Sequence, residues 1–164
     1  AAAGDIDILL STGGMGPGKY DLLESAFHDA GGEIVYRSLA MRPGQATLFG
    51  KINSKLYFGL PGPPSAVNIL FNEMVRPAVR KMQGVTFADH EEIMVSLEHD
   101  FSLRGSEVLC VKAGFLNRAD GRLRVRVTDR YEISNCLLLF PQGRTSYEAG
   151  SEVVAHSTNG LIIS

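Results

Sequence analysis

A glycine-rich run near the start of the sequence, residues 11–21, contains residue types that could bind an anion. Its glycines are Gly13, Gly14, Gly16 and Gly18. Because glycine has no Cβ, such a loop can adopt positive φ and bring backbone amides close to a ligand. The run separates an apolar segment from an amphipathic one, so the amides of a helix N-terminus would point to the same place. A phosphate or another oxyanion is the expected ligand, and a tight strand-to-helix turn without a ligand is the alternative.

Two later segments could complete the same site. Arg42 precedes Pro43 and Gly44, where a guanidinium on a stiff backbone could hold a phosphate through paired hydrogen bonds. The other segment is Pro61-Gly62-Pro63-Pro64-Ser65. It leads into a predicted long helix, so the Ser65 hydroxyl and the first amides of that helix could face the same ligand. Since ligands of parallel α/β folds bind beyond the carboxyl ends of strands, and each loop follows a predicted strand, we expect the three loops to converge on one pocket.

Asp21 closes the glycine-rich run and has two interpretations. It could cap the following helix, since Glu24 lies three residues later as in a capping box, and such a cap is worth about 1 kcal/mol. It could instead be a carboxylate beside the bound phosphate, where it would hold a Mg²⁺ ion or orient a reactant. The spacing by itself favours the cap.

The histidines and cysteines show no spacing typical of a metal site. These residues are His28, His90, His99, His156, Cys110 and Cys136. We interpret each histidine as a solvent-exposed imidazole. Both cysteines are interpreted as buried thiols of a protein in a reducing compartment.

The composition is that of an ordinary globular protein. The chain has 164 residues and a formal net charge of −2 at pH 7, which fits one medium domain or two small ones. Without a basic field, nucleic acid is not an expected partner. The sequence has no apolar run of about 18 residues and no recognisable signal peptide, so we expect neither a membrane span nor secretion, and a cytoplasmic location.

The first part of the chain alternates strands and helices. Residues 6–10 form an apolar run typical of a strand buried on both faces. Apolar side chains recur at helical spacing in residues 20–30, which predicts a helix there. Strands are predicted at residues 33–38, 46–51 and 55–60, and a long helix at residues 67–82 with a kink near Pro77. The first strand, the first helix and the second strand form a unit whose crossover should be right-handed.

Beyond Gly84 the pattern changes to strands alone. They are predicted at residues 92–101, 108–117, 123–129, 137–140 and 153–155, with a hairpin at Asp120-Gly121. We therefore expect two domains, residues 1–85 and residues 86–164. Because the first residue is not methionine and a strand follows almost at once, we expect a fragment whose sheet lacks N-terminal strands. The alternative is a small complete domain with an edge strand.

Several motifs occur in a specific order. They lie at residues 13–21 (Gly-Gly-Met-Gly-Pro-Gly-Lys-Tyr-Asp), 41–45 (Met-Arg-Pro-Gly-Gln), 58–66 (Phe-Gly-Leu-Pro-Gly-Pro-Pro-Ser-Ala), 80–84 (Arg-Lys-Met-Gln-Gly), 117–121 and 135–141 (Asn-Cys-Leu-Leu-Leu-Phe-Pro). This order resembles the molybdopterin molybdenumtransferase family, which includes MoeA and the C-terminal part of gephyrin. The resemblance covers essentially the whole chain and corresponds to the C-terminal portion of the family.

The resemblance implies an α/β fold, namely part of a three-layer molybdopterin-binding domain with a mostly parallel sheet, followed by a small all-β domain. It implies a homodimeric enzyme that inserts molybdenum from molybdate into adenylylated molybdopterin, with Mg²⁺ assisting and AMP released. Asp21 stands where the family has an acidic residue required for the chemistry, as a catalytic residue and metal ligand. The residues implied around the pterin phosphate or adenylate are Gly13, Gly14, Gly16, Gly18, Arg42, Pro43, Gly44, Pro61, Gly62 and Ser65.

Three positions depart from the family pattern. Gly16 stands where a serine is usual, Pro63 where an asparagine is usual, and Gln45 where a lysine is frequent. Each change removes a polar or charged group from the expected anion site. Two other functions therefore stay open, namely a non-catalytic scaffold of the gephyrin type and a related enzyme that acts on another nucleotide.

Overall fold

The structure is a computed structural model that describes residues 6–14, 20–86, 89–119, 121–129 and 132–158. The chain divides into two compact units, residues 1–70 and residues 71–164. The sequence pattern sets a domain boundary at residues 85 and 86 instead, and this boundary stays a prediction. In the described part of the chain, every helix is too short or too polar to cross a lipid bilayer.

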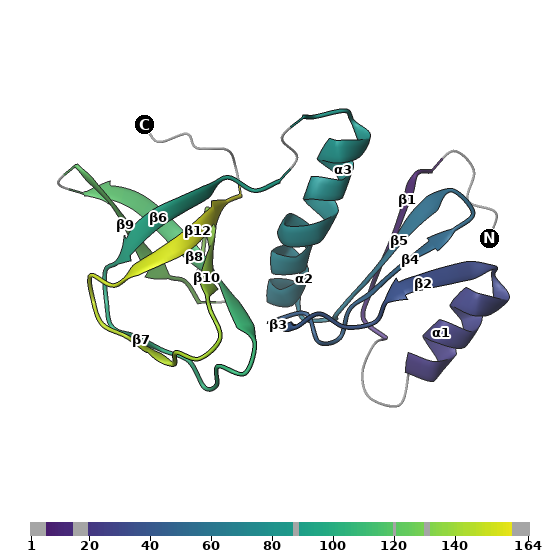
Figure 1. The fold of residues 1–164 in the computed structure, drawn as a ribbon, viewed down its shortest axis with the longest axis horizontal. Helices are drawn as coiled ribbons and strands as arrows, with labels where there is room; N and C mark the ends of the chain where they lie inside the picture. The colour runs from purple at the N-terminus through teal and green to yellow at the C-terminus, as the bar shows by residue number, and fades with distance from the viewer. Residues whose placement is uncertain (1–5, 15–19, 87–88, 120, 130–131, 159–164) are drawn as a thin grey trace. The chain divides into compact units, whose positions relative to one another are not determined.

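The described residues of the first unit contain a four-stranded sheet with the order β1-β5-β4-β2 (Figure 1). The strands are β1 (Ile8–Thr12), β2 (Gly32–Tyr36), β4 (Leu48–Ile52) and β5 (Lys55–Leu60). β1 pairs parallel with β5, whereas β4 pairs antiparallel with both β5 and β2. β1, β2 and β5 therefore run in one direction, in agreement with the predicted α/β fold. A short strand, β3 (Met41–Arg42), precedes β4.

Helix α1 (Tyr20–Asp29) packs on this sheet through Phe27. The Phe27 side chain is buried, and its ring centroid lies 4.8 Å from that of Tyr57. The ring fits because two facing positions carry no side chain. A Cβ on Gly32 would lie 2.5 Å from the ring, and a Cβ on Gly50 would lie 2.8 Å from it. The contact of helix and sheet thus includes an aromatic ring that lies over two glycines, with Leu23 packed in the same cluster.

Strand β1 lies at one end of the described sheet and is partly exposed. Leu9 and Leu10 are 41% and 40% exposed. The prediction that this apolar run is buried on both faces is therefore wrong for the chain as described. The reason is that the hydrophobic cluster around Phe27 takes its members from α1, β2, β4 and β5, and none of the buried or partly buried side chains assigned to it comes from β1.

The predicted long helix consists of three consecutive segments. α2 (Pro64–Leu70) ends the first unit, and η1 (Phe71–Val75) and α3 (Arg76–Met82) begin the second unit. η1 is a π-helical turn that ends two residues before Pro77, which has no N–H to donate. The departure from α-helical geometry lies where the sequence predicts a kink.

The described residues of the second unit contain a closed five-stranded barrel (Figure 1). Its strands are β6 (Glu92–Leu97), β8 (Leu109–Ala119), β9 (Arg122–Val127), β10 (Cys136–Phe140) and β12 (Glu152–Ser157). They follow the order β10-β12-β6-β9-β8, and the pairing of β10 with β8 closes the barrel. β6 and β9 pair parallel, and the other neighbours pair antiparallel. A separate short sheet joins β7 (Phe101–Ser102) to β11 (Ser146–Tyr147).

β8 and β9 form the hairpin that the sequence predicts. Their antiparallel register extends to Ala119 and Arg122, at the ends of the two strands. Gly121 has φ +73°, a conformation that favours glycine. Asp120 lies outside the described residues.

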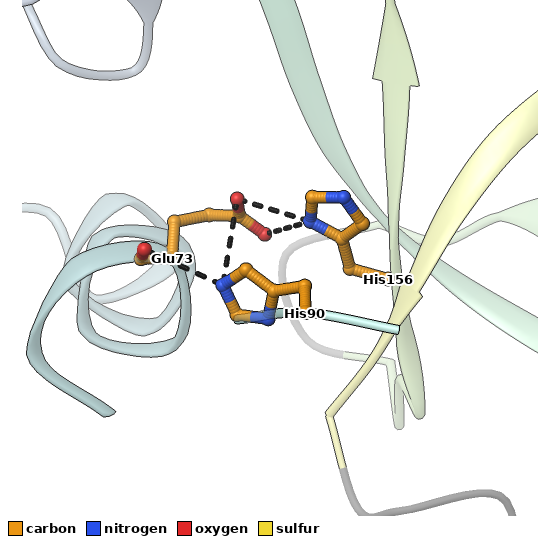
Figure 2. A group of neighbouring side chains, drawn as sticks. All are labelled: Glu73, His90 and His156. Atoms are coloured by element: carbon orange, nitrogen blue, oxygen red, sulfur yellow. Dashed lines mark hydrogen bonds and ion pairs between the residues drawn. The ribbon is translucent and has the colours of Figure 1, made fainter. Parts of the chain in front are cut away.

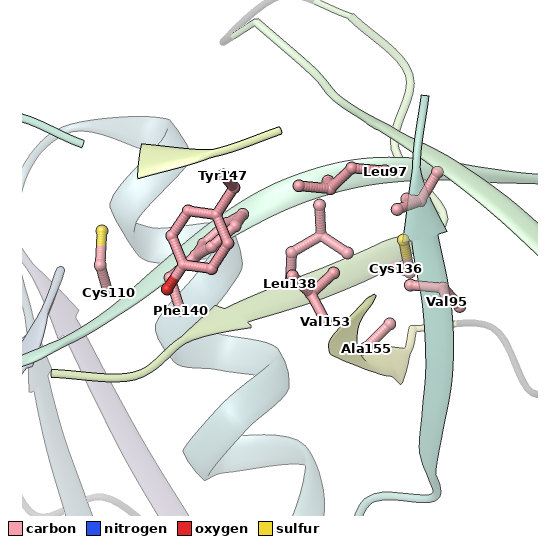
Figure 3. Packing of buried hydrophobic residues seen from close by; sticks show 10 residues of the cluster. Val95, Leu97, Cys110, Cys136, Leu138, Phe140, Tyr147, Val153 and Ala155 are labelled. Atoms are coloured by element: carbon pink, nitrogen blue, oxygen red, sulfur yellow. The ribbon is translucent and has the colours of Figure 1, made fainter. Parts of the chain in front are cut away.

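Side chains from all five strands fill the barrel interior (Figure 3). The buried members of this core are Val95, Leu97, Cys110, Val125, Cys136, Leu138, Phe140, Tyr147, Val153 and Ala155. Phe140 packs against Phe101 and Tyr147, with ring centroids 4.9 Å apart in each pair. The thiols of Cys110 and Cys136 are buried, as predicted.

Candidate functional site

The first and third predicted loops begin side by side in the first unit. β1 and β5 are neighbouring parallel strands, and their register ends with Thr12 opposite Leu60. The Gly13 N–H donates to the Leu60 carbonyl at 3.0 Å, and the half-buried Pro61 follows. A Cβ on Gly62 would lie 3.7 Å from the Gly13 Cα. The structure thus brings together two of the three loops at the carboxyl ends of adjacent parallel strands.

The start of the glycine-rich loop has the conformation expected of glycine. Gly13 has φ +78° and Gly14 has φ +75°, both in the left-handed region. Gly14 is exposed, and a Cβ there would meet no atom within 4 Å among the described contacts. The need for glycine at Gly14 therefore comes from its backbone conformation. Gly16 and Gly18 lie outside the described residues.

Asp21 lies in the first turn of α1, which begins at Tyr20. Negative charge in the first turn is favoured by the helix dipole, whether or not a ligand is bound. The position of the Asp21 side chain lies outside the description, so the cap and the functional interpretation both stay predictions.

The third loop offers fewer amides than an ordinary helix start. Pro63 and Pro64 have no N–H, and the N–H groups of Ala66 and Val67 both donate to the Pro63 carbonyl at 3.0 Å. Ser65 is exposed in the first turn of α2, so its hydroxyl faces solvent. The groups of this loop that stay available to a ligand are the Ser65 hydroxyl and the backbone at Gly62, and binding through them stays a prediction.

The second loop forms a tight turn with contacts of its own. Arg42 is exposed, and its peptide bond to Pro43 is cis. Gly44 is buried with φ +150°, and a Cβ there would lie 2.6 Å from the Met41 Cγ. The Leu39 N–H donates to the Gly44 carbonyl at 3.1 Å. These contacts explain Gly44 structurally, and the convergence of Arg42 with the other two loops stays a prediction.

A second group of polar side chains occurs in the barrel unit (Figure 2). Glu73 from η1, His90 from the segment before β6, and His156 from β12 lie together, with the Glu73 carboxylate facing both imidazole rings. The His156 Nδ1 lies 2.9 Å from Glu73 Oε1 and 3.1 Å from Oε2. The His90 Nε2 lies 3.8 Å from Oε2 and 3.4 Å from the Glu73 carbonyl oxygen. The two rings stack, with centroids 4.5 Å apart and planes 13° apart.

The exposure predicted for the histidines is right for two of them. His28 and His99 are exposed. His156 is buried and His90 is mostly covered, so the prediction is wrong for these two because η1 packs its carboxylate against β12. The sequence contains one weak signal of this group, since Glu73 is the only acidic residue between residues 64 and 82.

Comparison with known proteins finds relatives for the first unit and for most of the chain. Residues 1–81 match the family model described as a probable molybdopterin binding domain. The chain is 30% identical over 155 residues to the molybdopterin molybdenumtransferase of Staphylococcus aureus strain COL, a match that covers 90% of the chain and 37% of the relative. It is 28% identical over 159 residues to the protein of the same name from Staphylococcus epidermidis, covering 93% of the chain and 38% of that relative.

The fold also matches solved structures. A molybdopterin biosynthesis MoeA protein from Pyrococcus horikoshii superposes with a TM-score of 0.73 at 22% identity, over 94% of this chain and 38% of that one. A molybdenum cofactor biosynthesis protein from Pyrococcus furiosus superposes with a TM-score of 0.59 at 22% identity, over 84% of this chain and 54% of that one. The chain therefore spans little more than a third of the length of its curated relatives, and it belongs to the molybdopterin molybdenumtransferase, or MoeA, family of molybdenum cofactor biosynthesis.

Proposed function

We propose that the protein to which this chain belongs inserts molybdenum from molybdate into adenylylated molybdopterin and releases AMP. The observation that carries the proposal is the approach of Gly13 to Gly62 at the carboxyl ends of two adjacent parallel strands. Ligands of α/β folds bind at such positions, and glycine allows the backbone to come close to a phosphate. The names of the curated relatives support the same reaction.

In this proposal the loops bind the anionic groups of the substrate. The amides of the loop that starts with Gly13 and Gly14 would face the pterin phosphate or the adenylate. The Ser65 hydroxyl would donate a further hydrogen bond from the first turn of α2. The exposed Arg42 guanidinium would pair with phosphate oxygens through two parallel N–H groups. Together these groups hold and orient the substrate, which lowers the entropic part of the barrier.

Mg²⁺ fits the donor set of this region. The ion is usually held by one or two carboxylates together with substrate phosphates, and it keeps several of its waters. Asp21, in the first turn of α1 after the glycine-rich loop, supplies such a carboxylate. When bound there, Mg²⁺ would neutralise phosphate charge next to the reacting groups. By the same family inference, the full-length protein would be a cytoplasmic homodimer.

The test uses the full-length protein with adenylylated molybdopterin, molybdate and Mg²⁺. We expect Asp21→Ala to slow molybdenum insertion, measured as AMP release, by at least about 100-fold, the usual size of a lost polar catalytic group. Asp29→Ala is the matched control, because Asp29 is an exposed carboxylate at the other end of α1. Equal rates for Asp21→Ala and the unchanged protein would remove Asp21 from the reaction. Absence of binding of adenylylated molybdopterin to the unchanged protein, measured by calorimetry, would reject the proposed function.

A further inference from the structure

Glu73, His90 and His156 have the arrangement of a metal-binding triad. Each side chain offers one ligand atom, and the three atoms lie within 4.8 Å of one another. The residues come from a helix, a connecting segment and a strand, so they are close only because the second unit folds around them. The side chains are 12%, 15% and 9% exposed, respectively, which keeps the group largely out of bulk water.

Two of the three separations are near those that a tetrahedral metal ion imposes, and all three ligand atoms lie within 4.8 Å of one another. Zn²⁺ binds imidazole nitrogen and carboxylate oxygen at about 2.0–2.2 Å, so two ligand atoms lie about 3.3–3.5 Å apart. The Glu73 Oε2 lies 3.1 Å from the His156 Nδ1 and 3.8 Å from the His90 Nε2. One separation is slightly shorter and the other slightly longer than this range. Because a metal ion lies in the plane of each imidazole that binds it, the two stacked rings would have to turn out of their stack to bind one ion.

The hydrogen bonds of the group leave one buried polar atom without a partner. If the His156 Nδ1 donates to Glu73, the neutral ring carries a lone pair on Nε2. That nitrogen is buried and accepts no hydrogen bond from any described residue. Glu92 Oε1 lies 3.9 Å away, too far for a hydrogen bond. A metal ion on Nδ1 would instead leave Nε2 protonated, and the exposed Glu92 side chain would have to move closer than 3.9 Å to accept this N–H, as a carboxylate usually does.

The charges of the three side chains also favour a bound metal ion. The Glu73 carboxylate lies beside both stacked rings and can balance only one positive ring, and the next carboxylate is that of the exposed Glu92, 3.9 Å from the His156 Nε2. Two neutral imidazoles and one carboxylate, by contrast, form a donor set that zinc commonly uses, with a fourth position open to water. Other first-row divalent ions would bind the same donors in the order of their intrinsic affinity.

The elements that carry the ligands are also held by contacts outside the group. The Arg76 guanidinium in α3 donates to the Thr158 carbonyl, directly after β12. This bond joins the helix that carries Glu73 to the strand that carries His156. The ligands are thus positioned by the fold, and a bound ion would add a further connection between helix and barrel.

We propose that Glu73, His90 and His156 form a binding site for a divalent transition metal ion of the zinc class, which fastens the η1 helix and the segment before β6 to the barrel. The site shares no residue with the set assigned to molybdenum insertion. It therefore stands or falls independently of the proposed function.

The experiment uses tag-free, full-length protein that has been freed of metal by chelation. ZnCl₂ is titrated by calorimetry, and CoCl₂ is titrated by visible absorption, because tetrahedral Co²⁺ has characteristic bands. The variants are His90→Ala, at a partly exposed position outside the strands, and Glu73→Gln, which keeps the shape of the side chain. His99→Ala is the matched control, since His99 is an exposed histidine of the same unit. Circular dichroism verifies that each variant is folded.

We expect the unchanged protein and His99→Ala to bind Zn²⁺ with the same affinity. His90→Ala and Glu73→Gln should bind it at least about tenfold more weakly, because even the loss of an outer partner costs about 10–100-fold in metal affinity. The Co²⁺ bands should be lost in these two variants. Zn²⁺ affinities and Co²⁺ spectra that are the same in His90→Ala, Glu73→Gln and the unchanged protein would overturn the proposal. Absence of Zn²⁺ binding by the unchanged protein would overturn it as well.

Discussion

Cys136 is the first residue of strand β10, and its side chain is fully buried in the barrel core. Burial disfavours the thiolate and raises the pKa of Cys136 to about 12, although a hydrogen bond with the Leu116 backbone opposes this effect in part. The folded protein therefore holds the thiol proton more tightly than the unfolded chain does. The resulting stabilisation is fully present below the ordinary pKa of 9.0, and it is lost as the pH rises from there toward 12.

We expect alkaline pH to destabilise the protein partly through this thiol. The free energy of unfolding should fall by up to about 1.4 kcal/mol per pH unit for one such group. Cys136→Ala removes the titrating thiol and should give a shallower slope above pH 9.0. Denaturant unfolding at a series of pH values measures both slopes. Burial also raises the pKa of Tyr36 to about 12, so Tyr36 contributes the same pH dependence to both proteins. Any difference between the two slopes therefore comes from Cys136. An unchanged slope in Cys136→Ala would contradict this account.

Single residues differ in how far the sequence predicts their environment. The burial of both cysteines could be predicted, because free cysteine is among the most buried residue types. The burial of His156 could not, since its partner Glu73 lies 83 residues away along the chain. The left-handed conformations of Gly13 and Gly14 could be predicted from the glycine-rich sequence. The close packing of Gly44 could not, because it depends on where the Met41 side chain lies.

At the scale of elements, Phe27 is the buried residue of helix α1 in the cluster that joins this helix to its sheet, and Leu23 packs beside it. The ring lies over two glycines and against Tyr57, and it is 4% exposed. A cavity at this position cannot be filled by Gly32 or Gly50, because neither has a side chain. The attachment of α1 bears on the proposed function, because the first turn of this helix carries Asp21.

Phe27→Ala should therefore destabilise the first unit strongly. Loss of a buried phenylalanine side chain costs about 3–5 kcal/mol. His28→Ala, one residue later on the exposed side of α1, is the control and should stay within about 0.5 kcal/mol of the unchanged protein. Urea unfolding followed by circular dichroism measures both changes. A loss below about 1 kcal/mol for Phe27→Ala would mean that other contacts hold the helix.

Elements with local signals are present as predicted, whereas the burial of a strand and the closure of the barrel depend on distant partners and could not be predicted from the residue pattern. Helix α1 is predicted from the helical spacing of apolar side chains in residues 20–30, and the β8–β9 hairpin from Asp120-Gly121. Both patterns are properties of neighbouring residues, and both elements are present. The closure of the barrel through β8 and β10 depends on the register of separate strands, which residue pattern alone does not specify. The exposure of β1 has the same origin, because burial of an apolar strand requires cover from other elements.

At the scale of the whole molecule, each unit carries its own candidate ligand site. The first unit has the paired loops at Gly13 and Gly62, and its hydrophobic cluster surrounds Phe27. The second unit has the group of Glu73, His90 and His156 beside the barrel core. A ligand that binds only the folded state stabilises what it contacts by mass action. The two ligands should therefore protect different parts of the chain.

Hydrogen exchange of the full-length protein tests this separation. At about 100 times its dissociation constant, a ligand stabilises its site by about 2.7 kcal/mol, enough to slow the exchange of amides that open with it by about 100-fold. We expect Zn²⁺ to slow exchange in η1 and β12, and adenylylated molybdopterin with Mg²⁺ to slow exchange at the ends of β1 and β5. His90→Ala should abolish the first effect and keep the second, because His90 contacts Glu73 in the barrel unit. Protection of β1 and β5 by Zn²⁺ would contradict the assignment, since it would place the ion among the loops that we assign to the pterin substrate.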